Sequence, residues 1–146
     1  LLRRISAGRG APCGAWQARH SRSATGVCTP SGATSSTSGQ WGVPGRAPYV
    51  AAKWGILGLM KTLAMELGPL GIRVNAILPG GTDTPMGREV IDTPEKQRFM
   101  EGLHALGRWA HPKEIAGSVL HLASDSASFV TGSAFLVDGG ISIKRG

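Results

Sequence analysis

The sequence predicts an α/β fold in which helices cover a parallel sheet. Three observations support this prediction. The first is a helical apolar pattern over residues 49–67, followed by a β-branched run over residues 72–78. The second is an amphipathic helical pattern over residues 112–124, and the third is an apolar run over residues 133–140 that follows it. Helices and strands that alternate through short connections are typical of parallel sheets.

Residues 49–67, YVAAKWGILGLMKTLAMEL, are expected to form the first helix. At 100° per residue, six side chains fall within about 100° of arc and predict one face of this helix. These six are Tyr49, Lys53, Ile56, Met60, Leu63 and Leu67. Pro48 suits the first turn of the helix, and the Gly68-Pro69 pair is expected to end it.

The later elements follow from local composition. The run IRVNAIL over residues 72–78 favours a strand, which the Pro-Gly-Gly of residues 79–81 ends. Residues 86–106 are more polar and are expected to form short helices. The second long helix is predicted to begin at Pro112, and SAFLVDGG over residues 133–140 is predicted to contain the last strand.

The charge of the chain is unevenly distributed. The net charge is +7, yet residues 1–65 hold eight Lys or Arg and no acid, whereas residues 66–146 hold eight Lys or Arg and nine acids. The basic excess lacks interleaved aromatic residues, so binding to nucleic acid is the least favoured of the functions considered.

No apolar run approaches the roughly 18 residues of a membrane helix. LLRRI is too short for a secretory leader. The expected location is the cytoplasm.

Residues 1–34 form an atypical basic segment without hydrophobic periodicity. Three interpretations are open: a disordered basic arm, an organellar transit peptide, or translation from a wrong frame or start. The last is preferred, because Gly, Ala, Arg and Pro are the residues that GC-rich DNA encodes by default. Residues 35–146 are expected to form the ordered domain.

Tyr49 and Lys53 are the first candidates for chemistry. At positions i and i+4 of one helix they bring an ammonium close to a phenol. A phenol titrates near pH 10, so proton transfer at neutral pH needs a positive charge that stabilises the phenolate. Ser36, thirteen residues before the tyrosine, could hold a substrate carbonyl. The spacing alone would also suit a surface tyrosine packed on a lysine stem.

The surrounding motifs resemble the short-chain dehydrogenase/reductase family from about Ser35 to Gly140. The matching stretches are SSTSG followed by YVAAKWGILGLMKTLAMEL, then IRVNAILPGGTDTPM, then GRWAHPKEIAGSVLHLASDSASFVTGSAFLVDGG. The resemblance implies the C-terminal part of a Rossmann-like doubly wound parallel sheet. It also implies an oxidoreductase that transfers hydride between NAD or NADP and a small carbonyl or alcohol substrate. A homo-oligomer is expected for the intact parent.

The resemblance also assigns catalytic roles. Tyr49 would be the acid/base, Lys53 would stabilise the phenolate and hydrogen-bond the nicotinamide ribose, and Ser36 would orient the substrate carbonyl. Ser35 and Ser38 are alternatives for the hydroxyl, because all three lie in one Ser/Thr-rich run.

Cofactor binding is carried over in the same way. The residues assigned to it are Tyr49, Lys53, Pro79, Gly80, Thr82 and Thr84. Two alternatives stay open: Pro79 and Gly80 could only end a strand, and Thr84 could cap the next helix. No metal site is expected. His104, His111 and His121 lack ligand spacing and are interpreted as surface or partly buried residues, and Trp54 and Trp109 as packing residues.

The sequence also departs from the family pattern. It has no strand followed by a Gly-rich dinucleotide turn, and residues 1–74 contain no asparagine to match the one that the family places before its serine. We therefore expect that the N-terminal half of the sheet is missing and that this chain alone binds the cofactor weakly. The alternative function is a non-catalytic remnant that acts as an oligomerising module.

Overall fold

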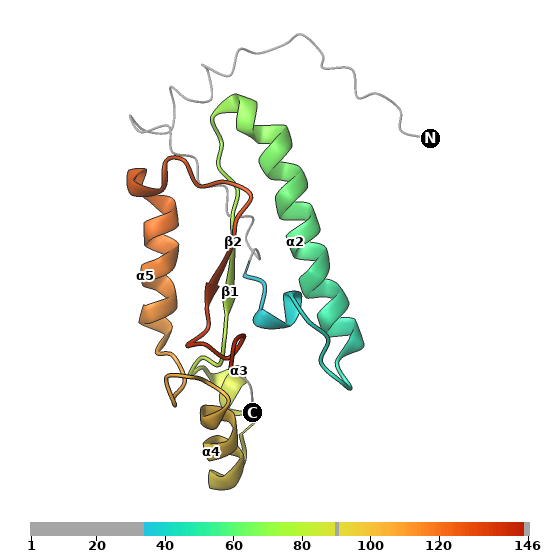
Figure 1. Ribbon diagram of the computed structural model, residues 1–146, viewed down its shortest axis with the longest axis vertical. Coiled ribbons are helices and arrows are strands. Elements are labelled where there is room, and N and C mark those ends of the chain that lie inside the picture. Colours follow the sequence, from blue (N-terminus) through green and yellow to red (C-terminus); the bar gives the residue numbers. More distant parts are fainter. Residues whose placement is uncertain (1–33, 90, 145–146) are drawn as a thin grey trace.

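Two long helices enclose a short parallel sheet in the computed structural model, which describes residues 34–89 and 91–144. Helix α2 (Ala47–Leu67) lies on one side of the strands and helix α5 (Pro112–Ala123) on the other (Figure 1). This arrangement confirms the predicted α/β class with parallel strands. The expectations for residues 1–33 lie outside the described residues.

Strand β1 is central in the described sheet. It covers Ala76–Pro79 and pairs in parallel with β2, Ala134–Val137, with Ala76 opposite Ala134. On its other edge Thr34 forms a parallel bridge with Ile77. The chain segment that leads into the serine-rich loop therefore starts beside β1.

The strand predicted over residues 72–78 is shorter than expected and ends later. Before residue 76 the Gly132 amide donates to the Val74 carbonyl at 2.7 Å, and side chains make the other contacts. The Val74 amide donates to Thr131 Oγ1 at 3.1 Å, and Asn75 Oδ1 accepts from the Ser133 amide at 3.0 Å. Asn75 Nδ2 donates to the Val130 carbonyl at 2.8 Å. These contacts hold the loop before β2 against the start of β1.

The side chains of β1 alternate between two hydrophobic clusters, as the period of a strand requires. The cluster beneath α2 contains Leu57, Met60, Ala64, Val74, Ala76 and Leu78. The cluster beneath α5 contains Ile77, Leu122 and Ala127. Because both faces of β1 are buried, the strand reads as a continuous apolar run rather than an alternating one.

Helix α2 begins and ends close to its predicted limits, with a proline in its first turn and Gly68 as its C-cap. Its buried face differs from the predicted one. Leu57 and Ala64 are buried although they lie outside the predicted stripe, whereas Tyr49 is 42% exposed. The reason is that α2 carries apolar residues on every side, so periodicity alone does not define which face meets the sheet.

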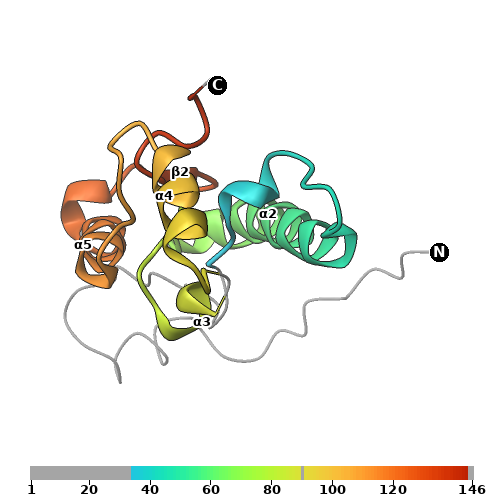
Figure 2. The same ribbon diagram turned by 90° about the horizontal axis from the view of Figure 1, so that it is seen from below.

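Two shorter helices lie between β1 and α5, as expected for this polar segment. They are α3 (Pro85–Arg88) and α4 (Pro94–Gly102), and each has a proline in its first turn. Seen from the carboxyl ends of the strands, α3 and α4 lie between α2 and α5 (Figure 2). The 3-10 turns are η1 (Thr37–Gly39), η2 (Gly68–Leu70) and η3 (Asp125–Ala127). In the part of the chain that the structure describes, no helix is both long and apolar enough to cross a membrane.

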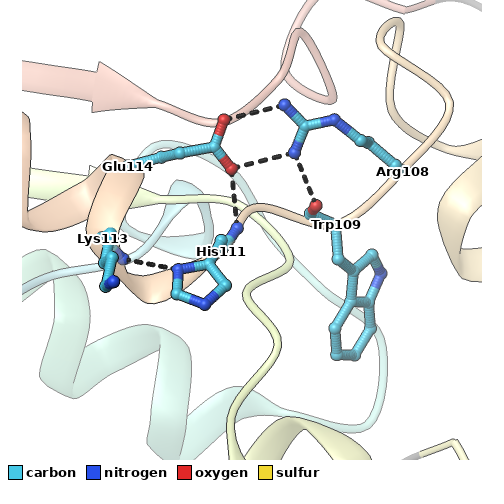
Figure 3. Close-up of polar contacts among 5 residues, drawn as sticks. All are labelled: Arg108, Trp109, His111, Lys113 and Glu114. Carbon is cyan, nitrogen blue, oxygen red and sulfur yellow. Dashed lines mark hydrogen bonds and ion pairs between the residues drawn. The ribbon is translucent and has the colours of Figure 1, made fainter.

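Helix α5 starts at Pro112, as predicted, behind a capping box. His111 Nδ1 accepts from the Lys113 amide at 3.1 Å, and the Glu114 carboxylate accepts from the His111 amide at 2.7 Å (Figure 3). Arg108 donates to both oxygens of the same carboxylate, at 2.7 and 2.9 Å. The hydrogen bonds from Arg108 and from the His111 amide lower the pKa of Glu114 to about 2.

We predict that Leu78→Ala lowers the free energy of unfolding by about 2–5 kcal/mol, because Leu78 is fully buried beneath α2. Leu120→Ala is the matched control, since this leucine is 70% exposed, and its effect should stay within about 0.5 kcal/mol. Denaturant unfolding of the two variants measures the difference. Equal losses at both positions would contradict the burial described for β1.

We also predict that Glu114→Gln destabilises the fold in a pH-dependent way. The folded pKa of Glu114 lies below its ordinary value of 4.5, so its ion pair stabilises the fold above that pH and loses its effect as the pH falls towards about 2. The midpoint of urea unfolding should therefore be lower in the variant than in the unsubstituted chain near neutral pH. This difference in midpoint should disappear in acid. Glu66→Gln, at an exposed position of α2, is the control. A difference in midpoint that does not depend on pH would refute the ion pair of Glu114.

Candidate functional site

The first turns of α2 bring Tyr49 and Lys53 together. Lys53 Nζ lies 5.4 Å from the centroid of the Tyr49 ring, within the range of a cation–π contact. The same nitrogen donates a hydrogen bond to the Thr34 carbonyl at 2.8 Å. The ammonium is thus held between α2 and the segment beside β1, while the tyrosine stays accessible.

The serine-rich loop packs on the same part of α2. The Ser35 hydroxyl is buried and donates to the Lys53 carbonyl at 3.0 Å. Ser36 is the N-cap of η1, and its hydroxyl oxygen accepts from the Ser38 amide at 3.2 Å. Ser35 therefore has a structural contact, whereas Ser36 and Ser38 are half-buried. Within the described residues, no hydrogen bond joins Ser36 to Tyr49.

Gly39 makes this approach of the loop to α2 possible. A Cβ at this position would lie 2.6 Å from Ser35 Oγ and 3.2 Å from the Lys53 carbonyl oxygen. Sequence reasoning missed Gly39, because its requirement arises only from the contact between the loop and the helix.

The turn after β1 contains the first pair of predicted cofactor residues. Pro79 is the last residue of β1 and pairs with Val137. The Gly80 amide donates to the Val137 carbonyl at 3.1 Å, and a Cβ at Gly80 would lie 2.7 Å from the Asp138 carbonyl oxygen. Gly80 is thus required where the backbones of the two strands separate, which agrees with the strand-ending interpretation.

Thr82 and Thr84 continue this turn. The Thr82 hydroxyl donates to the Gly80 carbonyl at 3.2 Å, and its backbone forms a bridge with Ala110. Thr84 is the N-cap of α3 and accepts from the Gly87 amide at 3.1 Å. Thr84 thus caps the next helix, as its alternative interpretation expected, and its assignment to cofactor binding stays a prediction. Because the cap uses an oxygen lone pair, the hydroxyl proton of Thr84 can still be donated to a second partner.

The two groups of predicted residues lie at the same end of the sheet. The N-terminal end of α2 and the carboxyl end of β1 both lie in the lower part of Figure 1, which also holds α3 and α4. Ligands of open α/β sheets bind beyond the carboxyl ends of the strands. Both groups of elements thus lie at the end of the sheet where such a fold binds its ligand, and the assignment of the individual residues stays a prediction.

An open hollow of about 470 Å³ lies beside α3 and α4. Its lining residues are Asp83, Arg88, Ile91, Gln97, Glu101, Arg108 and Trp109. Arg88 pairs with Asp83 at 2.6 Å, and this hydrogen bond lowers the pKa of the Asp83 carboxyl. The hollow therefore presents paired charges beside an indole.

His104 was expected at the surface or partly buried, and this expectation is wrong. Its side chain is 1% exposed. His104 Nε2 accepts from the Gly81 amide at 2.9 Å. Because the two residues are far apart in the sequence, no local pattern indicated this contact.

Comparison with known proteins agrees with the geometry. A family model described as enoyl-(acyl carrier protein) reductase matches residues 22–142. Cyclopentanol dehydrogenase of Comamonas sp. is 45% identical over 106 residues, which cover 73% of this chain and 42% of that protein.

Solved structures give the same result. A 4-hydroxyisoleucine dehydrogenase mutant complexed with NADH and succinate superposes with a TM-score of 0.74 at 37% identity, over 77% of this chain and 46% of that one. A variant of actinorhodin polyketide ketoreductase with NADPH gives a TM-score of 0.72 at 36% identity, over 76% and 46%. The chain thus spans less than half the length of these relatives. The matched sequence and the shared fold show that the chain belongs to the short-chain dehydrogenase/reductase family.

Proposed function

We propose that residues 35–146 form the C-terminal, proton-transferring part of an NAD(P)-dependent oxidoreductase. Its substrates would be small carbonyl compounds and secondary alcohols. The observation that carries this proposal is the position of the Lys53 ammonium 5.4 Å from the centroid of the Tyr49 ring, in the first turns of α2.

Tyr49 is the acid/base in this proposal. In the direction of reduction its phenol gives a proton to the carbonyl oxygen, and in the direction of oxidation the phenolate takes the proton of the alcohol. The nicotinamide cofactor, when bound, supplies or accepts the hydride. The phenol can meet a substrate oxygen directly, because Tyr49 is 42% exposed.

Lys53 stabilises the charge that develops on Tyr49. A cation near a phenolate favours the ionised form of the phenol. The hydrogen bond to the Thr34 carbonyl holds the ammonium in place before any ligand arrives, so little reorganisation is needed during proton transfer. The remaining ammonium protons can be donated to a ribose hydroxyl.

The cofactor would lie between α2 and the turn after β1. Tyr49 and Lys53 would contact its nicotinamide side, and Pro79, Gly80, Thr82 and Thr84 would border it. The chemistry of these residues fits such a ligand, since they offer a cationic donor, backbone amides and hydroxyl groups. The named neighbours with NADH and with NADPH support either nucleotide as the cofactor.

Ser36 would orient the substrate carbonyl. Ser35 is less suited to this role, because its hydroxyl already donates to the Lys53 carbonyl and is buried. The hollow beside α3 and α4 would receive the rest of a small substrate. The relative named cyclopentanol dehydrogenase supports a small alcohol as the substrate class.

A second function is favoured by the exposed apolar side chains. Large exposed residues occur on α2, on α5 and in the loop before β2, and they include Trp54, Met65, Leu120 and Phe129. Exposed apolar side chains contribute to association with further chains where they gather in one patch. The chain could therefore serve as an oligomerising module, and a homo-oligomer is also what we propose for the catalytic form.

Titration of NADH and NADPH against the purified chain, followed by nicotinamide fluorescence, separates the two functions. We predict saturable binding that requires high nucleotide concentrations.

Tyr49→Phe should leave this binding nearly unchanged and lower turnover of a secondary alcohol by about 10²- to 10⁴-fold, because the proton relay is lost. Absence of binding at millimolar nucleotide would favour the oligomerising module, and equal turnover of the variant would refute the role of the tyrosine.

The serine assignment has a matched pair of variants. Ser36→Ala should lower kcat by at least about tenfold, because a hydroxyl that orients the reacting carbonyl is removed. Ser38→Ala removes a neighbouring half-buried hydroxyl and should change kcat by less than about twofold. Steady-state kinetics with one alcohol and one cofactor measure both. The reverse order of effects would assign the role to Ser38.

A further inference from the structure

His104 connects two parts of the site that are distant in the sequence. It follows α4, in the segment that borders the hollow, and it contacts the turn after β1. Its ring is almost fully buried, and both ring nitrogens have a polar neighbour: the Gly81 amide at 2.9 Å from Nε2 and the Met100 carbonyl at 2.9 Å from Nδ1.

These contacts determine the tautomer of the His104 imidazole. Because an amide N–H donates into Nε2, this nitrogen carries no proton. The single proton of the neutral imidazole is then on Nδ1, where it is donated to the Met100 carbonyl. His104 thus acts as an acceptor towards the turn and as a donor towards α4.

Gly81 fits closely between His104 and Trp109. A Cβ at Gly81 would lie 2.8 Å from His104 Cε1 and 2.8 Å from Trp109 Nε1. The indole of Trp109 points away from the Arg108–Glu114 pair (Figure 3). Among the described residues its buried Nε1 has no hydrogen-bond partner. Trp109 therefore limits the space around Gly81, and the polar contact to the turn comes from His104.

The backbone of His104 is anchored as well. Its amide donates to the Glu101 carbonyl at 3.0 Å, and its carbonyl accepts from the Gly107 amide at 3.0 Å. Lys144 Nζ contacts the Gly102 carbonyl and lies 3.4 Å from the His104 carbonyl oxygen. The ring is consequently presented from a fixed backbone, which lets it determine where the Gly81 amide lies.

We propose that His104 is a positioning residue that fixes the Gly80–Gly81 turn against the end of α4. The proposal rests on the proposed function in one respect, namely that this turn borders the nicotinamide. His104 fixes the position of the turn after β1 relative to the end of α4. In the proposed function, that turn borders the cofactor and α4 borders the hollow that receives the substrate. The residue acts through the backbone of Gly81 and contacts no reacting atom.

Nuclear magnetic resonance of the isotope-labelled full chain tests the contact directly. We expect the His104 nitrogen shifts of a neutral ring protonated on Nδ1, together with a scalar coupling between the Gly81 amide nitrogen and His104 Nε2. A ring protonated on Nε2, or a Gly81 amide without this coupling, would overturn the proposal. This readout depends on neither nucleotide nor activity.

Two variants test the positioning role. His104→Gln keeps an acceptor near the position of Nε2, whereas the shorter side chain of His104→Asn cannot reach the Gly81 amide. Relative to the Leu78 amide in β1, exchange of the Gly81 amide should accelerate by at least about tenfold in the Asn variant and by less than about threefold in the Gln variant. Equal acceleration in both variants would indicate a purely structural role and overturn the proposal.

Nucleotide titration of the same variants keeps this proposal distinct from the proposed function. We expect the dissociation constant for NADH to rise by about tenfold in the Asn variant and to be restored by Gln. If the unsubstituted chain binds no nucleotide, the proposed function fails, while the coupling and exchange measurements still decide the role of His104. If the chain binds NADH and the Asn variant binds it equally well, His104 does not position the turn.

Discussion

Burial of β1 on both faces is the constraint on which the rest of the structure depends. A strand with apolar side chains on both sides needs cover on both sides, and α2 and α5 provide it through two separate clusters. Because the strand is short, its carboxyl end is close to the two helices that pack on its faces. The serine-rich loop packs on the first turns of α2 and begins beside Ile77 of β1, two residues before the turn that begins at Pro79.

The sequence predicted the elements whose patterns are strong. Helices α2 and α5 and strand β2 were recognised from periodicity and from proline and glycine at their ends, and the spacing of Tyr49 and Lys53 correctly placed them side by side. The start of β1 was misjudged, because Asn75 hydrogen-bonds in place of a ladder. The buried face of α2 was misjudged, because a helix that is apolar all round has no single preferred face.

The rest of the site could not be read from the sequence, because it is built from contacts between distant segments. The hydrogen bond between His104 and Gly81 spans 23 residues, and the one between Lys53 and Thr34 spans 19. No local pattern encodes such pairs. His111 as a helix cap escaped notice for another reason: caps are usually Ser, Thr, Asp or Asn, and a histidine is seldom considered.

The lack of room for a side chain at Gly80 has a consequence for how this fold can diversify. Any larger residue there would push apart the ends of the two strands, so mutation at the turn disturbs the whole framework. Around the hollow, by contrast, none of the seven lining residues belongs to a strand, and three of them, Arg88, Gln97 and Arg108, are exposed. Substitutions at the exposed positions of α3 and α4 would therefore reshape the hollow while the turn after β1 keeps its backbone geometry.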